Sequence, residues 1–395
     1  MSAGAAISQT ADSTVTNNQI QLGDVFATQT LDVVSSSDQT TATTTATGNA
    51  FSGAVETGSV DVQSRQQMDG DATASTTLNG TGNIGLAVSL TTAATGNTGD
   101  AESLGAGALT GSFAQSTNVV SIAADSQVSA ASAIAGDVSA NSQAFANSQG
   151  LGVTGGSIDA SVTQTSQATV QATGGGNVMY TPGTLTFTGT AVANNISTSG
   201  TDSTQSITAS QLMTGASTQA YQQVGVGNAQ TVTAAATATG NNFSAANQGA
   251  NLNVVVEQEN DSYTRAEAQL GSYEFGTSSA QAFGVGNSVL ASNTGEQISL
   301  DNTQINIGGG IESIANSSGT DGYDISSSAT AMGNAVTGFA CTTCGGRMTI
   351  GNSQTNNANI GATSSLTVDG SARSSVGTAT AVGNSATFYV SSPGG

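Results

Sequence analysis

The sequence predicts an all-β protein, an elongated β-solenoid (β-helix) of stacked repeats, and three observations support this fold. A phrase of small and polar residues, such as AATATGN at 235–241, recurs along the chain at a nearly constant spacing. Short runs of valine, isoleucine and threonine, such as NLNVVVEQ at 251–258, have the alternation of strands. Only 2 of 395 residues are proline, which cannot donate a hydrogen bond to a β-ladder.

The recurring phrase defines the repeat. Aligned on one asparagine, its eight copies are 48, 50, 47, 47, 46, 47 and 50 residues apart, which predicts units of about 48 residues that stack on their neighbours. Weaker Gly-Asn pairs at Asn83, Asn177, Asn228 and Asn352 suggest two coils of about 24 residues in each unit. Sixteen such coils would form a rod about 75 Å long. The eight asparagines are Asn49, Asn97, Asn147, Asn194, Asn241, Asn287, Asn334 and Asn384.

Within the phrase, alternating small residues predict a strand, and Gly-Asn predicts a corner. Alanine and threonine suit a narrow interior, and glycine permits a positive φ at the corner. Asparagines stacked at the same corner of successive coils could hydrogen-bond to one another as a ladder. The eight asparagines are therefore our candidate structural site.

The phenylalanines near these asparagines are predicted to fill the interior. Their periodic placement favours core packing over an exposed ligand-binding face. They are Phe51, Phe145, Phe187, Phe243, Phe283, Phe339 and Phe388.

We divide the chain into an N-terminal cap or first coil over residues 1–40, an eight-unit β repeat array over 41–390 and a C-terminal tail over 391–395. The strand-like ATFYVSS at 386–392 lies close to the end of the chain, so the last coil looks poorly capped. Unpaired terminal coils suggest self-association end to end or docking on a partner.

The charge of the chain argues against several partners. Four arginines and no lysine face 25 acidic residues, which gives a net charge of −21. Nucleic acid and anionic membrane surfaces both require a positive footprint, so neither is an expected partner.

The residue types that are absent argue against catalysis. The chain has no histidine and no lysine, which excludes Ser-His-Asp and Cys-His arrangements, Schiff bases and phosphate-binding lysines. We predict that the protein is not an enzyme and needs no cofactor. Clusters of carboxylates leave Ca²⁺ binding open, although no EF-hand or GGxGxD pattern occurs. They lie at Asp69 and Asp71, at 257–261, and at Asp321 and Asp324.

Cys341 and Cys344, in CTTC, are the only cysteines. Without histidine they cannot complete a zinc site within one chain, and no βαβ context supports a thioredoxin motif. A local disulfide that clamps a turn in an oxidising compartment is our interpretation, with reduced thiols as the alternative.

The sequence contains no run of about 20 apolar residues that could span a membrane as a helix. The first residues, MSAGAAISQTADSTV, have neither a charged leader nor an apolar stretch. We expect an extracellular protein in its mature form, from which a signal peptide has been removed.

Several of these features together resemble one family. The ATGN phrases, the segment FSAANQGANLNVVVEQEN at 243–260, the absence of lysine and the late CTTC are similar to the HfaD family of holdfast anchor proteins from stalked and budding bacteria. The resemblance implies export to the outer surface of the outer membrane. It also implies two companion anchor proteins, one curlin-like and one an outer-membrane lipoprotein, which together fix an adhesive polysaccharide, the holdfast, to the cell envelope. It implies no catalytic residues.

Two other classes remain open. Gln- and Asn-rich phrases at 8–23 and 352–361 are compatible with a curlin-like subunit that polymerises, although their spacing is less regular than a curlin repeat requires. A phage or surface β-fibre, or a carbohydrate-active β-helix, is the third class.

Overall fold

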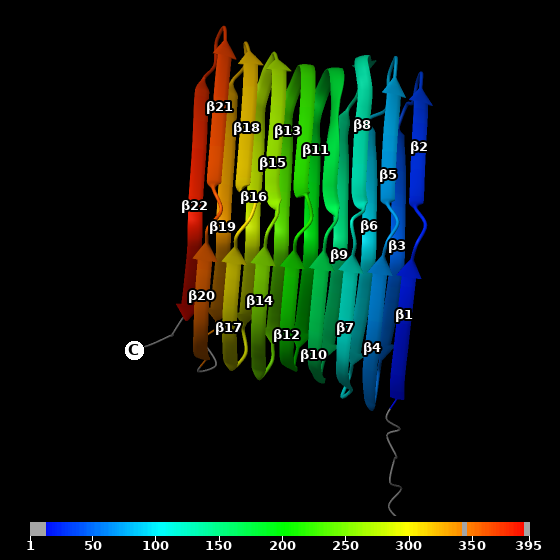
Figure 1. The fold of residues 1–395 in the computed structure, drawn as a ribbon. Helices are drawn as coiled ribbons and strands as arrows, with labels where there is room; N and C mark the ends of the chain where they lie inside the picture. The colour runs from blue at the N-terminus through cyan, green and yellow to red at the C-terminus, as the bar shows by residue number, and fades with distance from the viewer. Residues whose placement is uncertain (1–12, 342–345, 391–395) are drawn as a thin grey trace, which may run out of the picture.

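The computed structural model describes residues 13–341 and 346–390, and over these ranges the chain is built from strands and connecting loops without a helix (Figure 1). The strands lie in three rows, so the all-β prediction is confirmed. The first row is β1 (Ser13–Gln21), β4 (Ser59–Met68), β7 (Ala108–Thr117), β10 (Ser157–Ser166), β12 (Thr204–Met213), β14 (Asn251–Asn260), β17 (Gln297–Asn306) and β20 (Arg347–Asn356).

The other two rows meet where long strands run from one into the next. The second row is β2 (Val25–Val33), β5 (Ala72–Gly80), β8 (Ser121–Ile134), the first part of β11 (Thr169–Thr201), the first part of β13 (Ser217–Gln248), β15 (Tyr263–Tyr273), β18 (Ile311–Thr320) and β21 (Ile360–Asp369). The third row is β3 (Gln39–Val55), β6 (Ala87–Leu104), β9 (Asp137–Thr154), the later parts of β11 and β13, β16 (Phe275–Asn293), β19 (Asp324–Ala340) and β22 (Ser374–Val390).

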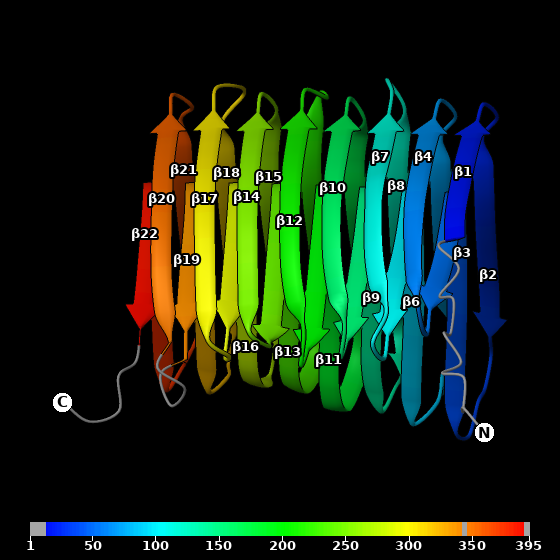
Figure 2. The same ribbon diagram turned by 90° about the horizontal axis from the view of Figure 1, so that it is seen from below.

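Each repeat unit forms one coil. Every strand pairs in parallel with the strand at the same place in the next repeat, for example Ala229 with Phe275 and Ala87 with Asp137. These partners lie one whole repeat apart, so the expectation of two coils in each repeat is wrong. Eight coils follow one another in sequence order (Figure 2). At about 4.8 Å between coils, they span about 34 Å rather than about 75 Å.

The weaker Gly-Asn pairs misled the estimate of coil length because they occupy unrelated positions in the coil. Asn177 is aligned with Gly225 within the second row, whereas Asn228 pairs with Tyr180 near the end of that row. Asn352 lies in the first row, opposite Asn302. They therefore form no column and mark no second coil.

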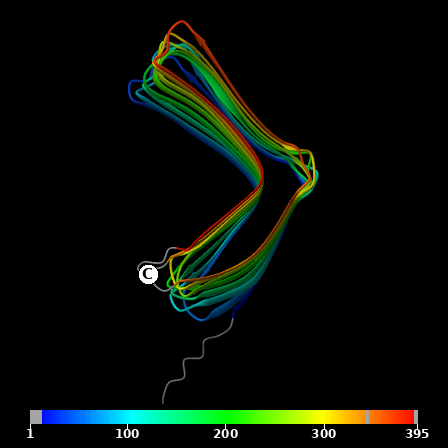
Figure 3. The same ribbon diagram turned by 90° about the vertical axis from the view of Figure 1, so that its left-hand side faces the viewer.

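Seen along the coil axis, each coil is V-shaped (Figure 3). The long strands line the inner side of the V, and the short strands of the first and second rows form its outer side. Each arm has its own hydrophobic core. One contains Leu90, Ile122 and Phe187, and the other contains Leu109, Phe113 and Phe243.

The long strands bend at the Gly-Asn corner. Gly96 and Asn97 are both buried, so the alternation of inward and outward side chains is interrupted there. Gly96 is left out of the pairing register, in which Thr95 aligns with Phe145 and Asn97 with Asn147. A Cβ atom on Gly96 would lie 2.6 Å from the carbonyl oxygen of Ala146.

The expectation of a positive φ at this corner is wrong. The glycines with positive φ lie elsewhere, for example Gly85 and Gly155. The close approach of neighbouring backbones leaves room at the corner for glycine or, as at Ala146 and Ala193, for a side chain no larger than a methyl group.

The prediction of a phenylalanine core is correct for only part of the set. Phe187 and Phe243 are fully buried, but Phe283 and Phe388 are exposed and Phe51, Phe145 and Phe339 are half-buried. Phe51 packs against a core and Phe388 aligns with the buried Gly338, so both point inward, and they are only partly covered because they lie in the first and last coils. Phe145, Phe283 and Phe339 face outward, because side chains alternate between interior and solvent along the strand.

The described part of residues 1–40 contributes β1 and β2 to the first coil, which β3 completes. The predicted tail, 391–395, lies outside the described residues.

Replacement of Phe187 by Ala should lower the free energy of unfolding by about 3 to 5 kcal/mol, because the side chain is 0% exposed and would leave a cavity. The matched variant Phe283→Ala removes a side chain that is 40% exposed and should cost less than about 1 kcal/mol. Urea unfolding of the two variants measures the difference. Equal losses would contradict the assignment of these two faces.

Candidate functional site

The eight repeat asparagines lie in one column at the inner corner of the V. The side-chain Nδ2 of each donates a hydrogen bond to Oδ1 of the next, at 2.8 to 2.9 Å, from Asn49 to Asn384. From Asn97 to Asn334 these side chains are 0% exposed. A buried amide requires partners, and here the partner is the same residue of the next coil.

Each asparagine also uses its second N–H. Asn241, for example, donates to the carbonyl oxygen of Glu259 at 2.8 Å, and Asn287 donates to that of Ile305 at 2.8 Å. These carbonyls belong to the facing strand of the first row. The asparagine column therefore connects successive coils and also the two layers at the corner.

A second column, of glutamines, runs beside the first. Nε2 of each glutamine donates to Oε1 of the glutamine in the preceding coil, at 2.7 to 2.9 Å. Its other N–H reaches the carbonyl of the residue after a column asparagine, as from Gln211 to Asn242 at 2.9 Å. The column is Gln19, Gln66, Gln115, Gln164, Gln211, Gln258, Gln304 and Gln354.

The two columns have opposite polarity. Asparagine amides donate toward the C-terminal coil, as from Asn194 to Asn241, and glutamine amides donate toward the N-terminal coil, as from Gln211 to Gln164. Sequence reasoning missed the glutamine column. A signal was available, because a glutamine precedes each column asparagine at a nearly constant distance along the chain, as Gln211 precedes Asn241. Glutamine is frequent in this chain, and the alignment on Gly-Asn alone did not single these residues out.

A small charged cluster lies on the outer face of the second row. Arg265 is 2.5 Å from Glu267 and 3.3 Å from Glu312, and the hydroxyl of Tyr263 donates to Glu312. Burial, followed by the hydrogen bond to Glu312, raises the pKa of Tyr263 to about 12. The cluster pairs its own charges, which is the arrangement of a structural ion-pair network.

The carboxylates singled out from the sequence are not brought together into one site. Asp71 accepts a hydrogen bond from the backbone N–H of Ser121, and Asp324 forms an ion pair with Arg373 near the other end of the stack. Across residues 13–341 and 346–390, no three acidic or cysteine residues are grouped closely enough to hold a metal ion.

The predicted disulfide is not placed by the structure. Cys341 directly follows β19, whereas Cys344 lies outside the described residues. The pairing of Cys341 with Cys344 stays a prediction. Separately, the described part of the chain has no helix that is long and apolar enough to cross a membrane.

Comparison with known proteins identifies one family. The family model described as HfaD, holdfast attachment protein D, matches residues 34–310. No curated protein matches the chain, and no solved structure matches it. The matched residues run from the end of the first coil's second strand into the seventh coil and contain most of both columns.

Replacement of Asn241 by Leu should lower the free energy of unfolding by about 2 to 4 kcal/mol. The variant leaves the amide of Asn194, Oδ1 of Asn287 and the carbonyl of Glu259 without their partner. The double variant Asn194→Leu/Asn241→Leu should cost less than the sum of the single variants, because both remove the same bond. Chemical denaturation measures all three. The exposed Asn253→Leu is the control, and a loss as small as the control's would contradict the role of the column.

Stability should also fall at high pH through Tyr263. Its pKa in the folded chain, about 12, exceeds the ordinary value of about 10, so the contribution is present below pH 10 and is lost as pH rises from 10 to 12. Because this tyrosine is partly exposed, solvent screening should keep the effect below about 1 kcal/mol. The wild type's advantage over Tyr263→Phe in unfolding free energy should shrink across that window. A constant difference would refute this.

Proposed function

Because the chain belongs to the HfaD, holdfast attachment protein D, family, we propose that it is a structural cell-surface protein that anchors an adhesive polysaccharide to the cell envelope. The observation that carries this proposal is the pair of amide columns, which run through all eight coils with opposite polarity. The chain has neither the histidine nor the lysine that the nucleophilic and phosphate-binding sites considered above require, and the proposed role is structural rather than catalytic.

The columns make the stack suitable for bearing load. Each coil is joined to the next by three parallel strand pairings and by the two amide bonds inside the corner. Separation of two coils in the middle of the stack requires all of these bonds to break together. A stack of this kind transmits force along the coil axis and offers few exposed backbone groups to a protease.

We further propose that a second copy of the chain docks end to end. The edges of β1, β2 and β3 at one end, and of β20, β21 and β22 at the other, have no paired strand among the described residues. Open edges of parallel strands are templates for pairing. An interface between two different ends is heterologous and continues as a filament.

The ends of the two columns complement each other. At the C-terminal coil, Asn384 has a donor that the column leaves unused, and Oε1 of Gln354 receives no bond from a following glutamine. At the N-terminal coil, and among the residues from 13 onward that the structure describes, Oδ1 of Asn49 receives no bond from a preceding asparagine and Gln19 has no preceding glutamine to donate to. One docking geometry satisfies both columns, with Asn384 donating to Asn49 and Gln19 donating to Gln354.

The side chains of the two ends also match at one offset. Asn49 and Asn384 are separated by the same distance along the chain as Gln19 and Gln354, and so are the inward residues Leu31 and Leu366. The offset also places Asp38 next to Arg373, which have opposite charges. All three rows can therefore continue into a second copy without a shift of register.

The companion anchor proteins and the location at the outer membrane remain part of this proposal. Both follow from the family resemblance, and the match to the HfaD family supports a role in holdfast attachment. The open ends also favour a second candidate function, a curlin-like subunit that polymerises, because the same docking continues into a filament.

Loss of the chain should release the polysaccharide from cells. We expect cells that lack the gene to synthesise the polysaccharide but to shed it into the medium, and the wild-type gene to restore retention. A fluorescent lectin, measured on cells and in the supernatant, reports both fractions. Normal retention by the deletion strain would refute the anchor function.

Substitution of Leu366 by Lys should prevent end-to-end association. An inward charge on the last coil would be buried by a docked copy, while in the single chain it stays half-buried at an open end. Thr363→Lys adds the same charge to the outward face of β21 and is the control. In sedimentation velocity at rising concentration, wild type and control should form multiples of the 38.3 kDa chain, and Leu366→Lys should remain a monomer.

Two results would bear against this docking. A wild type that stays monomeric at every concentration would refute it, and so would association of Leu366→Lys equal to that of the control. Filaments that grow after a lag and bind amyloid dyes would move the function to the polymerising subunit.

A further inference from the structure

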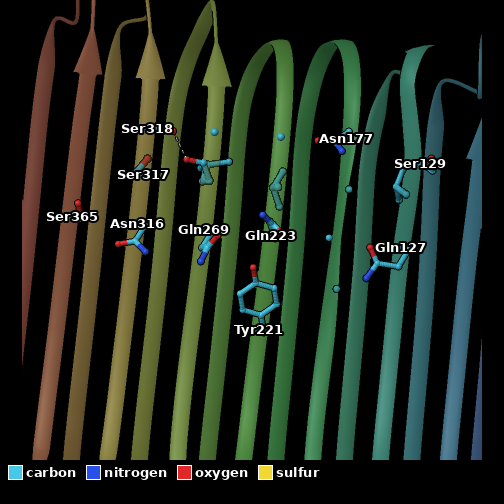
Figure 4. A pocket seen from close by; sticks show the side chains of 18 of the residues that line it. Gln127, Ser129, Asn177, Tyr221, Gln223, Gln269, Asn316, Ser317, Ser318 and Ser365 are labelled. Atoms are coloured by element: carbon cyan, nitrogen blue, oxygen red, sulfur yellow. Dashed lines mark hydrogen bonds between the residues drawn. The ribbon is translucent and has the colours of Figure 1, made fainter.

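A depression of about 740 Å³ lies on the outer face of the second row (Figure 4). It crosses β8, β11, β13, β15, β18 and β21, so its long direction follows the coil axis rather than the strands. An adjoining depression of about 620 Å³ shares Gly225 and Gly271 with it and extends toward the ends of the strands.

The depression exists because glycines replace outward side chains in neighbouring coils. One line of outward positions across successive coils consists of Asn177, Gly225, Gly271 and Ser318. Two successive coils therefore contribute no side chain to this line. In the line beside it, Gly175 aligns with Gln127 on one side and Gln223 on the other. The floor is therefore backbone, and the walls are amides and hydroxyls.

The wall amides are available to a ligand. Among the described residues, the side chains of Asn177, Gln223 and Asn316 form no hydrogen bond, although amides inside the stack are bonded in columns. Gln223, Gln269 and Asn316 follow one another across three coils, so they present donors and acceptors at the spacing of the coils.

Tyrosines gather on the same part of the molecule. Tyr221 lines the main depression, Tyr273 lines the adjoining one, and Tyr180 and Tyr323 line a third of about 690 Å³ where the second row passes into the third. Tyr273 is 50% exposed and Tyr323 63% exposed. A tyrosine presents an apolar ring face together with a polar hydroxyl, which suits the alternating apolar and hydroxyl surfaces of a sugar ring.

Charge narrows the class of ligand. The net charge of the chain is −21, and both arginines near these depressions are already paired. Arg265 pairs with Glu267 and Glu312, and Arg373, which lies over the ring of Tyr323, pairs with Asp324. A polyanion, such as a polyuronate or a nucleic acid, would be repelled. A neutral chain with many hydroxyl groups would meet amides, hydroxyls and aromatic rings.

We propose that this depression binds a neutral glycan chain that lies along the coil axis, across β11, β13, β15 and β18. The proposal rests on the anchor function above and assigns to it a binding surface. A ligand with repeating units suits a surface whose polar groups repeat from coil to coil. Because the depression is open along the coil axis, it accommodates a chain rather than a single sugar.

Gly271→Thr is the sharpest test. A Cβ atom at Gly271 would lie 3.6 Å from Oγ of Ser318, an ordinary contact, so the fold should accept a side chain that fills the floor of the depression. Gly361→Thr is the matched control. It lies on the outward face of the same row, where a Cβ atom would meet nothing within 4 Å, and it does not line the depression.

Affinity electrophoresis of the full chain through gels that contain hydroxyethyl cellulose, dextran, glycol chitin or alginate measures binding. We expect at least one of the three neutral glycans to retard wild type and Gly361→Thr equally. Gly271→Thr and Tyr221→Ala should bind that glycan about tenfold more weakly or worse. Alginate, a polyanion, should not retard the protein. Equal thermal unfolding of the glycine variants verifies that both are folded.

Three outcomes would overturn the proposal. They are the absence of retardation by every neutral glycan, equal retardation of Gly271→Thr and Gly361→Thr, and binding of alginate as strong as that of the neutral glycans. The cell assay separates this inference from the anchor function. If Gly271→Thr loses glycan binding in vitro while the deletion strain retains its polysaccharide, the depression is a glycan site and the anchor function fails. If the deletion strain sheds polysaccharide but no glycan binds in vitro, the anchor stands and this site fails.

Discussion

The structure depends on the requirement that buried side-chain amides be hydrogen-bonded. Asn194 is fully buried at a corner where glycine and alanine let the backbones of neighbouring coils approach closely. The amide must therefore find its hydrogen-bond partners inside the protein. The partner that every coil can supply in the same place is the same amide of its neighbour. Insertion of one residue into the strand that carries a column member would turn its amide to the other face, whereas the 46 to 50 residues between successive column asparagines vary without breaking the column. The columns therefore hold the first and third rows in register.

The same requirement explains why the coil is a V and not a flat sandwich. The Gly-Asn pair places two consecutive residues inside, which bends the long strand and divides the interior into two cores. Without further bonds the two arms could shift relative to each other. The second N–H of Asn241 and that of Gln211 cross the corner in opposite directions, to Glu259 and to Asn242. Each of these two amides thus joins coils through one hydrogen and layers through the other, so neither leaves a donor unused.

Sequence reasoning reached the fold class and the asparagine column because a residue that must meet its own copy leaves a strict period. It did not reach the number of residues in each coil. The repeat period alone does not show whether the strands inside one repeat form one coil or two. The glutamine column has the same period, but glutamines at Gln63, Gln67 and elsewhere obscure it.

Phe283 shows a third limit. Its distance along the chain from the corner does not reveal its face, because the bend changes the alternation of side chains on one side of the corner. The outer depression was not foreseen, because Gly225 and Gly271 become neighbours only through the register of the coils.

A column of amides with one polarity can be complete only in the middle of a stack. At each end it leaves a donor or an acceptor unused, and two columns of opposite polarity leave one of each. If the columns ran in the same direction, one end would present only donors and the other only acceptors. With opposite polarity, each end presents a mixed pattern, which a partner must match in both columns and in the direction of its strands at the same time. An unrelated strand edge can satisfy the backbone but not both amides. The opposite polarity therefore gives the open ends specificity for a coil of the same design, whether it belongs to another copy or to another chain with the same two columns.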